Sequence, residues 1–209
     1  MKTLIWDFNG TIIDDAVYCL EIEKKMLRDR GMYADFTLEE YKDMFCFPVI
    51  NYYYKLSYTF ENESYDDISV EFNRLYAEGF SSVKLVEGFR ETIAKATELG
   101  YQHVILCATR EDLLKKQCRD LGIDGLFKEI LGTDNLLAGS KIDMAKRWMK
   151  ENDIVPEECL YIGDTIHDLE TAAALNIKNY TLVSCGHQSY KVLKEYTDRV
   201  VHSLSEVPL

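Results

Sequence analysis

The chain opens with an apolar run, Thr3 to Phe8, that is interrupted only by Asp7 and ends at the turn-forming pair Asn9-Gly10. A strand that is apolar on both of its sides is typical of a parallel sheet that helices cover on both faces. Such runs recur later in the chain, so the first strand is expected to belong to a larger sheet. The further candidates are 103–108, 160–162 and 180–183, with weaker ones at 129–131 and 199–201.

Helical segments separate the later strands. Each of three expected helices is followed directly by a glycine or asparagine, residue types that tolerate the backbone conformation that closes a helix. These helices are 87–99, 111–121 and 165–175. From about residue 86 onward the alternation predicts an α/β fold with a doubly wound parallel sheet and right-handed crossovers. In such folds the ligand site lies at the carboxyl ends of the strands.

Residues 16 to 84 interrupt this alternation and have the pattern of helices only. Thr37 opens a sequence typical of a capping box, which marks a helix start. The segment holds 9 of the 14 tyrosines and 6 of the 9 phenylalanines, and its run Tyr52–Tyr54 must send at least one ring to solvent or to the cleft. We expect an inserted, all-helical cap with its own aromatic core. The expected boundaries are 15–84 for the cap and 1–14 with 85–209 for the catalytic core.

The charge balance limits the partners of the chain. With 24 Lys and Arg against 36 Asp and Glu, the formal net charge is −12, which disfavours nucleic acid because phosphate backbones are bound by excess Lys and Arg. No apolar run approaches the roughly 20 residues that span a bilayer, so no membrane association is expected. The 6 cysteines are scattered without a Cys-x-x-Cys pair. We interpret them as reduced thiols of a cytoplasmic protein, either a monomer or a homodimer.

Four polar residues lie at or just beyond expected strand ends: Asp7, Thr109, Lys141 and Asp164. A buried acid needs a cation or hydrogen bonds to offset its desolvation. If two strands bring Asp7 and Asp164 together, the carboxylates repel each other unless a cation lies between them, and Mg²⁺ suits oxygen ligands. Lys141 and Thr109 would add a positive charge and a hydroxyl donor, which is what holding a phosphoryl group requires.

The stretch Asp7 to Asp14 resembles the first motif of the haloacid dehalogenase-like (HAD) phosphohydrolases. Thr109, Lys141 and the stretch Gly163 to Asp168 resemble the second, third and fourth motifs, in that order. The helical insert between the first two motifs resembles the phosphoglycolate phosphatase-like branch with a helical cap. This resemblance covers essentially the whole chain. It implies a HAD-like Rossmannoid core, Mg²⁺ as cofactor and a small phosphorylated metabolite as substrate.

The resemblance also assigns roles to individual residues. Asp7 would be the nucleophile that attacks phosphorus and becomes an aspartyl phosphate. Lys141 would neutralise the crowded negative charge. The metal would be held by Asp7, the main-chain carbonyl of Asn9, Asp164 and, directly or through water, Asp168.

The phosphoryl oxygens would be bound by Thr109 and by main-chain amides near Phe8, Asn9 and Arg110. Gly10 would allow the tight turn of the first motif, and Thr11 would hydrogen-bond within that turn. Two further residues are candidates for substrate contact because of their position. The side chain of Arg110 either meets a substrate anion or stays in solvent, and His187 follows the strand that ends near 183.

Asn9 departs from the family pattern. The family's phosphatases carry a second acid two residues after the nucleophile, which protonates the leaving alcohol and later activates water. An amide does neither, and general acid–base catalysis is typically worth about 10²–10⁴-fold. Three explanations stay open: a natural enzyme with slow turnover or a preference for good leaving groups, an engineered replacement, or a phosphate-binding protein with little activity.

The predicted function is therefore Mg²⁺-dependent hydrolysis of small phosphate monoesters, with turnover weakened by Asn9. A non-catalytic or regulatory phosphate-binding protein is one alternative. A phosphonatase that cleaves C–P bonds is another, because it also lacks an acid at the position of Asn9. That reaction needs a Schiff-base lysine in the cap, for which Lys24, Lys42 and Lys55 are available.

Overall fold

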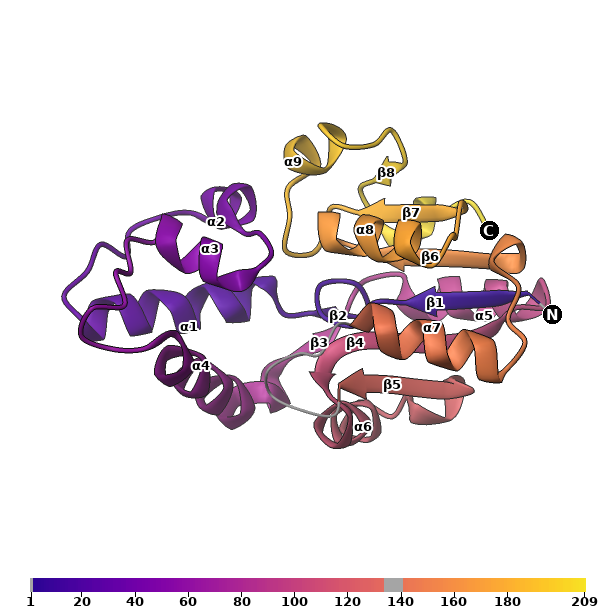
Figure 1. The fold of residues 1–209 in the computed structure, drawn as a ribbon, viewed down its shortest axis with the longest axis horizontal. Coiled ribbons are helices and arrows are strands. Elements are labelled where there is room, and N and C mark those ends of the chain that lie inside the picture. The colour runs from indigo at the N-terminus through magenta and orange to yellow at the C-terminus, as the bar shows by residue number, and fades with distance from the viewer. Residues whose placement is uncertain (1, 134–140) are drawn as a thin grey trace.

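The computed structural model of the chain describes residues 2–133 and 141–209. A six-stranded parallel sheet runs through the larger part of the molecule in the order β5-β4-β1-β6-β7-β8 (Figure 1). The first strand lies inside this sheet, between β4 and β6, and all of its residues are buried. The strands are β1 (Thr3–Trp6), β4 (Gln102–Arg110), β5 (Glu129–Thr133), β6 (Cys159–Gly163), β7 (Tyr180–Val183) and β8 (Val200–Val201).

Alternate residues of these strands face two different layers of helices. Leu4 and Trp6 belong to an apolar cluster that includes residues of α5 and α6, whereas Ile5 belongs to a second cluster with residues of α7 and α8. Helices therefore cover both faces of the sheet, which confirms the predicted doubly wound α/β fold. The helices of this part are α5 (Phe89–Glu98), α6 (Glu111–Asp120), α7 (Lys141–Glu151), α8 (Ile166–Ala174) and α9 (Tyr190–Lys194).

Residues 16–82, in the connection from β1 to β4, form a helical lobe beside the sheet (Figure 1). Two of its helices begin with the capping boxes of Thr37 and Ser64, the first of which the sequence predicted. A short antiparallel pair, which the sequence did not indicate, joins the lobe to the core: β2 (Ile13–Asp14) and β3 (Lys84–Leu85). The helices of the lobe, called the cap below, are α1 (Ala16–Asp29), α2 (Leu38–Met44), α3 (Val49–Lys55) and α4 (Tyr65–Gly79). Single-turn 3₁₀ helices span Phe80–Ser82, Asp124–Leu126, Pro156–Glu158 and Leu204–Glu206.

The interior of the cap is rich in aromatic rings. Tyr52 and Tyr53 are buried there, and Tyr54, which is 54% exposed, is the member of the run that reaches solvent. The expectation of a separate cap core was wrong. A single apolar cluster contains residues of the cap helices, residues after β1 such as Phe8 and Ile12, and residues on one face of the sheet.

The cap contacts the core through α2 and the loop between β7 and α9. The Lys42 ammonium donates to the carbonyl oxygens of Ser184 (3.2 Å) and Cys185 (3.0 Å), and the Gln188 side chain donates to the carbonyl of Phe45 (2.9 Å). These bonds hold the cap over the carboxyl ends of the strands. Among the described residues, no helix has the length and apolar character needed to cross a bilayer.

Candidate active site

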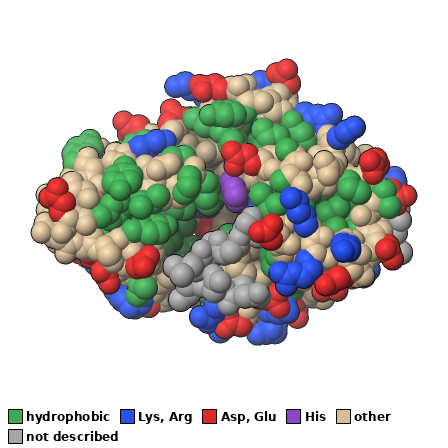
Figure 2. Space-filling model, viewed as in Figure 1, with side chains coloured by type: hydrophobic (Ala, Val, Ile, Leu, Met, Phe, Trp, Pro, Cys, Tyr) green, Lys and Arg blue, Asp and Glu red, His purple; other side chains and the backbone are tan. Residues whose placement is uncertain are grey.

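A cavity of about 520 Å³ lies between the cap and the carboxyl ends of β1, β4 and β6. Figure 2 shows the hollow between the two parts, with a histidine and acidic side chains beside it. The lining joins Asp7, Thr109 and Asp164 from the sheet edge to aromatic side chains of the cap. This is the edge at which doubly wound sheets bind their ligands.

Asp7 directly follows β1, and its amide donates to the carbonyl of Ile162 in β6 (2.9 Å). Its carboxylate is paired with the buried ammonium of Lys141 (Nζ–Oδ1 2.9 Å). Lys141 opens α7, and the same ammonium also pairs with Asp168 (2.6 Å). Because two carboxylates hold the lysine, its positive charge is fixed beside Asp7.

The carboxylate of Asp168 is occupied by donors of the protein. Its Oδ1 accepts hydrogen bonds from Lys141 and from the Tyr161 hydroxyl (3.1 Å). Its Oδ2 accepts from the amide of Asp164 (3.2 Å) and from the amide (3.0 Å) and hydroxyl (2.7 Å) of Thr165, which caps α8. Asp168 thus positions Lys141 and the turn that carries Asp164.

Asp164 follows β6 and has no exposed surface. Its carboxylate accepts hydrogen bonds from the Thr11 hydroxyl (3.1 Å) and from the His187 amide (2.6 Å). The close approach of the first-motif turn requires Gly10, whose φ is +72°. A Cβ at this position would lie 2.3 Å from Oδ2 of Asp164, so a side chain does not fit.

One carboxylate oxygen from each of Asp7, Asp164 and Asp168 lies within 4.8 Å of the others. Burial raises the pKa of Asp7 well above its usual range, Asp168 raises it further, and Lys141 offsets only part of this. Burial likewise raises the pKa of Asp164 to about 6. A divalent cation with oxygen ligands would relieve this repulsion, so the residues fit a Mg²⁺ site.

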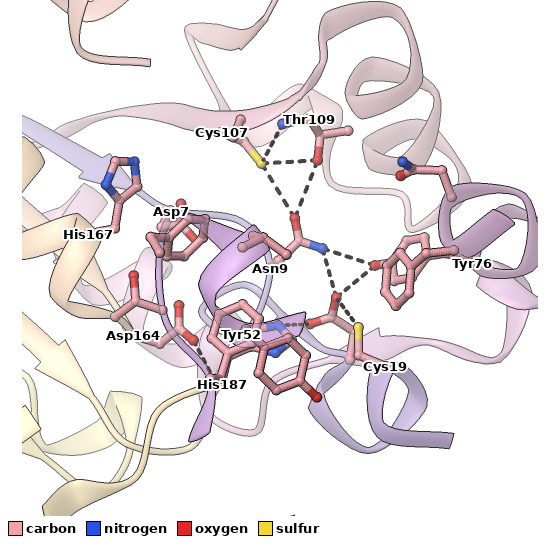
Figure 3. A pocket seen from close by; sticks show the side chains of 18 of the residues that line it. Asp7, Asn9, Cys19, Tyr52, Tyr76, Cys107, Thr109, Asp164, His167 and His187 are labelled. Carbon is pink, nitrogen blue, oxygen red and sulfur yellow. Dashed lines mark hydrogen bonds and ion pairs between the residues drawn. The ribbon is translucent and has the colours of Figure 1, made fainter. Parts of the chain in front are cut away.

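The side chain of Asn9 lies at the centre of a hydrogen-bonded network (Figure 3). Its amide nitrogen donates to the carboxylate of Asp15 (2.7 Å) and to the hydroxyl of Tyr76 (3.0 Å). Its carbonyl oxygen accepts from the thiol of Cys107 (3.5 Å) and from the hydroxyl of Thr109 (3.4 Å). The network joins the end of β1, the cap helix α4 and the strand β4 around one amide.

His187 and Asp15 form a buried ion pair next to this network. The Nε2 atom of His187 lies 3.1 Å from Asp15, and Nδ1 lies 2.8 Å from the hydroxyl of Tyr41 in α2. Burial opposes the imidazolium, but the Asp15 carboxylate raises the pKa of His187 to about 9. Burial also opposes the charge of Asp15, yet His187 and the hydrogen bonds to it lower the pKa of Asp15.

A family model described as haloacid dehalogenase-like hydrolase matches residues 4–182. The chain belongs to this family. The likeness extends to solved structures of the fold. A haloacid dehalogenase-like family hydrolase from Streptococcus pneumoniae superposes with a TM-score of 0.78 at 18% identity, over 99% of this chain and 96% of the other. At that identity the superposition establishes the fold alone.

Curated relatives of this haloacid dehalogenase-like chain include proteins with different activities. The tyrosine-protein kinase PtkA of Mycobacterium tuberculosis is 28% identical over 118 residues, which are 55% of this chain. The match spans only 40% of the length of PtkA. A phosphoglycolate phosphatase from Colwellia psychrerythraea is 21% identical over 189 residues, covering 87% of this chain and 84% of that protein.

The structure brings most of the candidate residues of this haloacid dehalogenase-like chain to one cavity. Asp7, Asn9, Thr109, Lys141, Asp164 and His187 all line it. Phe8 is fully buried, and its carbonyl accepts from the amides of Thr11 (3.4 Å), Ile12 (2.9 Å) and Ile13 (3.1 Å).

Thr11 and Arg110 are the remaining candidates for contact with the phosphoryl group. Thr11 hydrogen-bonds within its turn through its amide, which donates to the carbonyl of Phe8 (3.4 Å). Its side chain is fully buried, and the hydroxyl orients Asp164, because the turn packs directly against that carboxylate. Arg110 also lines the cavity, and its exposed guanidinium pairs with Asp112.

The partners of Asn9 are not apparent from the sequence. Asp15 falls at the expected boundary between core and cap, and its place just before a buried helix is the one local signal of such a role. Its carboxylate accepts from the Gly10 amide (2.8 Å) as well as from Asn9, Tyr76 and His187. Tyr76 lies far away in the sequence, in the cap, and no local pattern separates it from the other tyrosines there.

Proposed function

We propose that the chain is a Mg²⁺-dependent hydrolase of small phosphate monoesters, of the phosphoglycolate phosphatase type, that forms an aspartyl phosphate on Asp7. Asp7 itself is the observation that carries the proposal. Its carboxylate lines a cavity, lies 2.9 Å from a buried ammonium and belongs to a group of three acids that suits a hard cation. A carboxylate held in this way can attack phosphorus while its neighbours carry the charge.

The other residues would bind and orient the phosphoryl group. Lys141, fixed by Asp168, would neutralise negative charge next to Asp7. The Thr109 hydroxyl, together with main-chain amides after β1, would donate to phosphoryl oxygens. Mg²⁺, held by Asp7, Asp164 and the main-chain oxygen of Asn9, would supply charge neutralisation at the phosphoryl oxygens. The cap would exclude water during attack.

Asn9 would weaken both halves of the reaction. Its amide neither protonates a leaving alkoxide nor takes a proton from water. Substrates whose leaving group is already a good one, such as aryl phosphates, do not need the acid. The proposed enzyme therefore cleaves aryl or acyl phosphates far better than alkyl phosphates.

The test is hydrolysis of p-nitrophenyl phosphate in the presence of Mg²⁺, followed by acid quench and mass analysis of the peptide that contains Asp7. We expect turnover that EDTA abolishes, a phosphorylated Asp7 peptide, and loss of both in Asp7→Asn. Asp14→Asn is the matched control, because Asp14 lies in the same motif and is exposed.

Undiminished hydrolysis in Asp7→Asn would contradict the nucleophile. A protein that binds inorganic phosphate but forms neither an aspartyl phosphate nor a beryllofluoride adduct would instead be a phosphate-binding member of the family.

We place the enzyme in the reducing cytoplasm, which the six free cysteine thiols support.

A further inference from the structure

The cap side of the cavity is a wall of aromatic rings. Tyr52 of α3 packs against Tyr41 (ring centroids 5.7 Å apart), Phe45 (5.3 Å) and Tyr53 (5.9 Å). If Asp7 receives the phosphoryl group, this wall faces the leaving group of the substrate. Aromatic faces attract organic cations as well as apolar groups. The aromatic lining of the cap comprises Tyr41, Phe45, Phe47, Tyr52, Tyr53, Phe72 and Tyr76.

A carboxylate from α1 is part of this wall. Glu23 lines the cavity and is only 3% exposed. It forms a hydrogen bond with Tyr53, but its Oε2 atom is buried and has no hydrogen-bond partner in the described structure. A buried acceptor without a donor costs about 1–3 kcal/mol. A ligand that brings a donor would remove this cost.

Two other residues of the lining also have a buried polar atom without a hydrogen-bond partner. The Tyr52 hydroxyl and the Oε1 atom of Gln117 are buried and have no hydrogen-bond partner in the described structure. With Glu23, three residues of the lining therefore carry a buried side-chain oxygen without a hydrogen-bond partner in the described structure. A protonated primary amine carries three N–H donors and no acceptor. Such a group can donate to the unpartnered oxygen of Glu23 and brings no acceptor that would itself need a partner.

The cations near Glu23 are paired with other carboxylates. Arg30 acts on Glu23 electrostatically but is engaged by Glu63 (2.6 Å) and Glu71 (2.5 Å). Arg74, which also lines the cavity, pairs with Glu78 (2.6 Å). Burial raises the pKa of Glu23 to about 8, because the cations of the chain do not compensate its charge.

We propose that the leaving group of the substrate carries a protonated amine, which binds to Glu23 within the aromatic wall of the cap. This rests on the phosphatase function proposed above. The reaction would cleave the P–O bond of an aminoalkyl phosphate with water and release an amino alcohol and inorganic phosphate. Phosphoglycolate would be a poor substrate, because the carboxylate of its leaving group brings no N–H donor for the unpartnered oxygen of Glu23.

The test compares ω-aminoalkyl phosphates of two to six carbons with n-alkyl phosphates of the same number of heavy atoms. We expect kcat/KM to be at least about tenfold higher for the amine at the best chain length. In Glu23→Gln this ratio falls to about one, while the kcat/KM for the n-alkyl phosphates stays the same. Glu21→Gln is the matched control, since Glu21 is an exposed residue of the same helix and its change leaves the ratio as it is.

A second measurement does not depend on turnover. Calorimetry follows the binding of butylammonium, with 1-butanol as the uncharged comparison. We expect binding of the ammonium in the unmodified protein and in Asp7→Asn, and at least a tenfold weaker affinity in Glu23→Gln.

Equal kcat/KM for amine and alkyl substrates, or an amine preference that survives Glu23→Gln, would overturn the amine proposal and leave the phosphatase intact. If no phosphate ester is hydrolysed, the phosphatase proposal fails and calorimetry alone decides the amine site. Absence of ammonium binding would then overturn it.

Discussion

Asn9 occupies a position where both polar atoms of its side chain have partners. The amide nitrogen is bound by Asp15 and Tyr76, and the carbonyl oxygen by Cys107 and Thr109. An asparagine fits here because Asp15 needs a donor on this side. The acid that the family's phosphatases carry at this position would face the Asp15 carboxylate.

The variant Asn9→Asp is expected to raise kcat for alkyl phosphates by roughly 10²-fold, with a smaller gain for aryl phosphates, because it restores proton transfer to the leaving group. The new carboxyl would lie against the Oδ2 atom of Asp15, where the amide nitrogen is now 2.7 Å away. We expect a loss of about 1–3 kcal/mol in the free energy of unfolding. Steady-state kinetics measures the change in kcat, and urea denaturation measures the change in the free energy of unfolding.

The combination of Asn9→Asp with Asp15→Asn exchanges donor and acceptor within the same pair. It is expected to recover only part of the stability lost in Asn9→Asp, since the hydrogen bond between the two side chains is restored with its direction reversed but the ion pair of Asp15 with His187 is lost. An equal gain for aryl and alkyl esters, or no gain at all, would speak against Asn9 as the limiting residue.

Gly10→Ala is expected to abolish phosphatase activity. The added Cβ would meet Asp164 at 2.3 Å in a backbone with φ of +72°. Gly31→Ala is the matched control, because φ is +67° and nothing lies within 4 Å of the added atom. It should cost only the backbone strain, about 1–2 kcal/mol, and leave kcat unchanged. Equal kinetic effects in the two variants would mean that the clash with Asp164 does not matter.

At the scale of elements, α2 is the cap helix that contacts the core loop 184–189. Lys42 donates to two carbonyls of this loop, and the amide of Ser189 donates to the carbonyl of Lys42 (3.3 Å). Phe47, just after α2, stacks on His167 of α8 with ring centroids 4.7 Å apart. The cap thus rests on the core at the rim of the cavity.

Lys42→Met keeps the aliphatic stem and removes the two charge-assisted hydrogen bonds. Amide hydrogen exchange of α2 is expected to become faster, and KM to rise several-fold, because the cap is held less firmly over the bound substrate. Lys25→Met removes an exposed pair with Asp29 elsewhere in the cap and serves as control. If α2 exchanges at the same rate in both variants, these bonds do not hold the cap.

At the scale of the whole molecule, folding encloses Glu23 between α1 and the rest of the cap. The groups that act on it are Tyr53, Arg30 and Glu71. Burial raises its pKa from 4.5 to about 8. The folded protein therefore keeps the proton of Glu23 over a pH range in which the unfolded chain has lost it. Glu23 thereby makes its own contribution to the pH dependence of stability.

The free energy of unfolding is expected to fall as the pH rises from 4.5 to about 8, because only the unfolded chain gains from ionising Glu23. The loss attributable to this residue is on the order of 4 kcal/mol. Urea denaturation at several pH values, compared with Glu23→Gln, measures it. The variant should match the unmodified protein near pH 4.5 and exceed it at pH 8, and parallel curves would contradict the assignment.

The sequence by itself determined the fold class and the main acids of the site. Apolar strands separated by helices indicate a doubly wound sheet, because the period of burial is a local property. The motif residues Asp7 and Asp164 follow strands, and parallel strands bring their carboxyl ends together whatever the details of packing. The helical cap was predicted for the same reason.

Only the tertiary structure decided which side chains surround Asn9 and what the cap presents to the cavity. Asp15, Tyr76 and Cys107 come from three different elements, and no spacing along the chain predicts that they meet. Glu23 looks like an ordinary acid of a helix until packing buries it without a cation. Such contacts depend on how the cap docks on the sheet, which long-range packing sets and local periodicity does not.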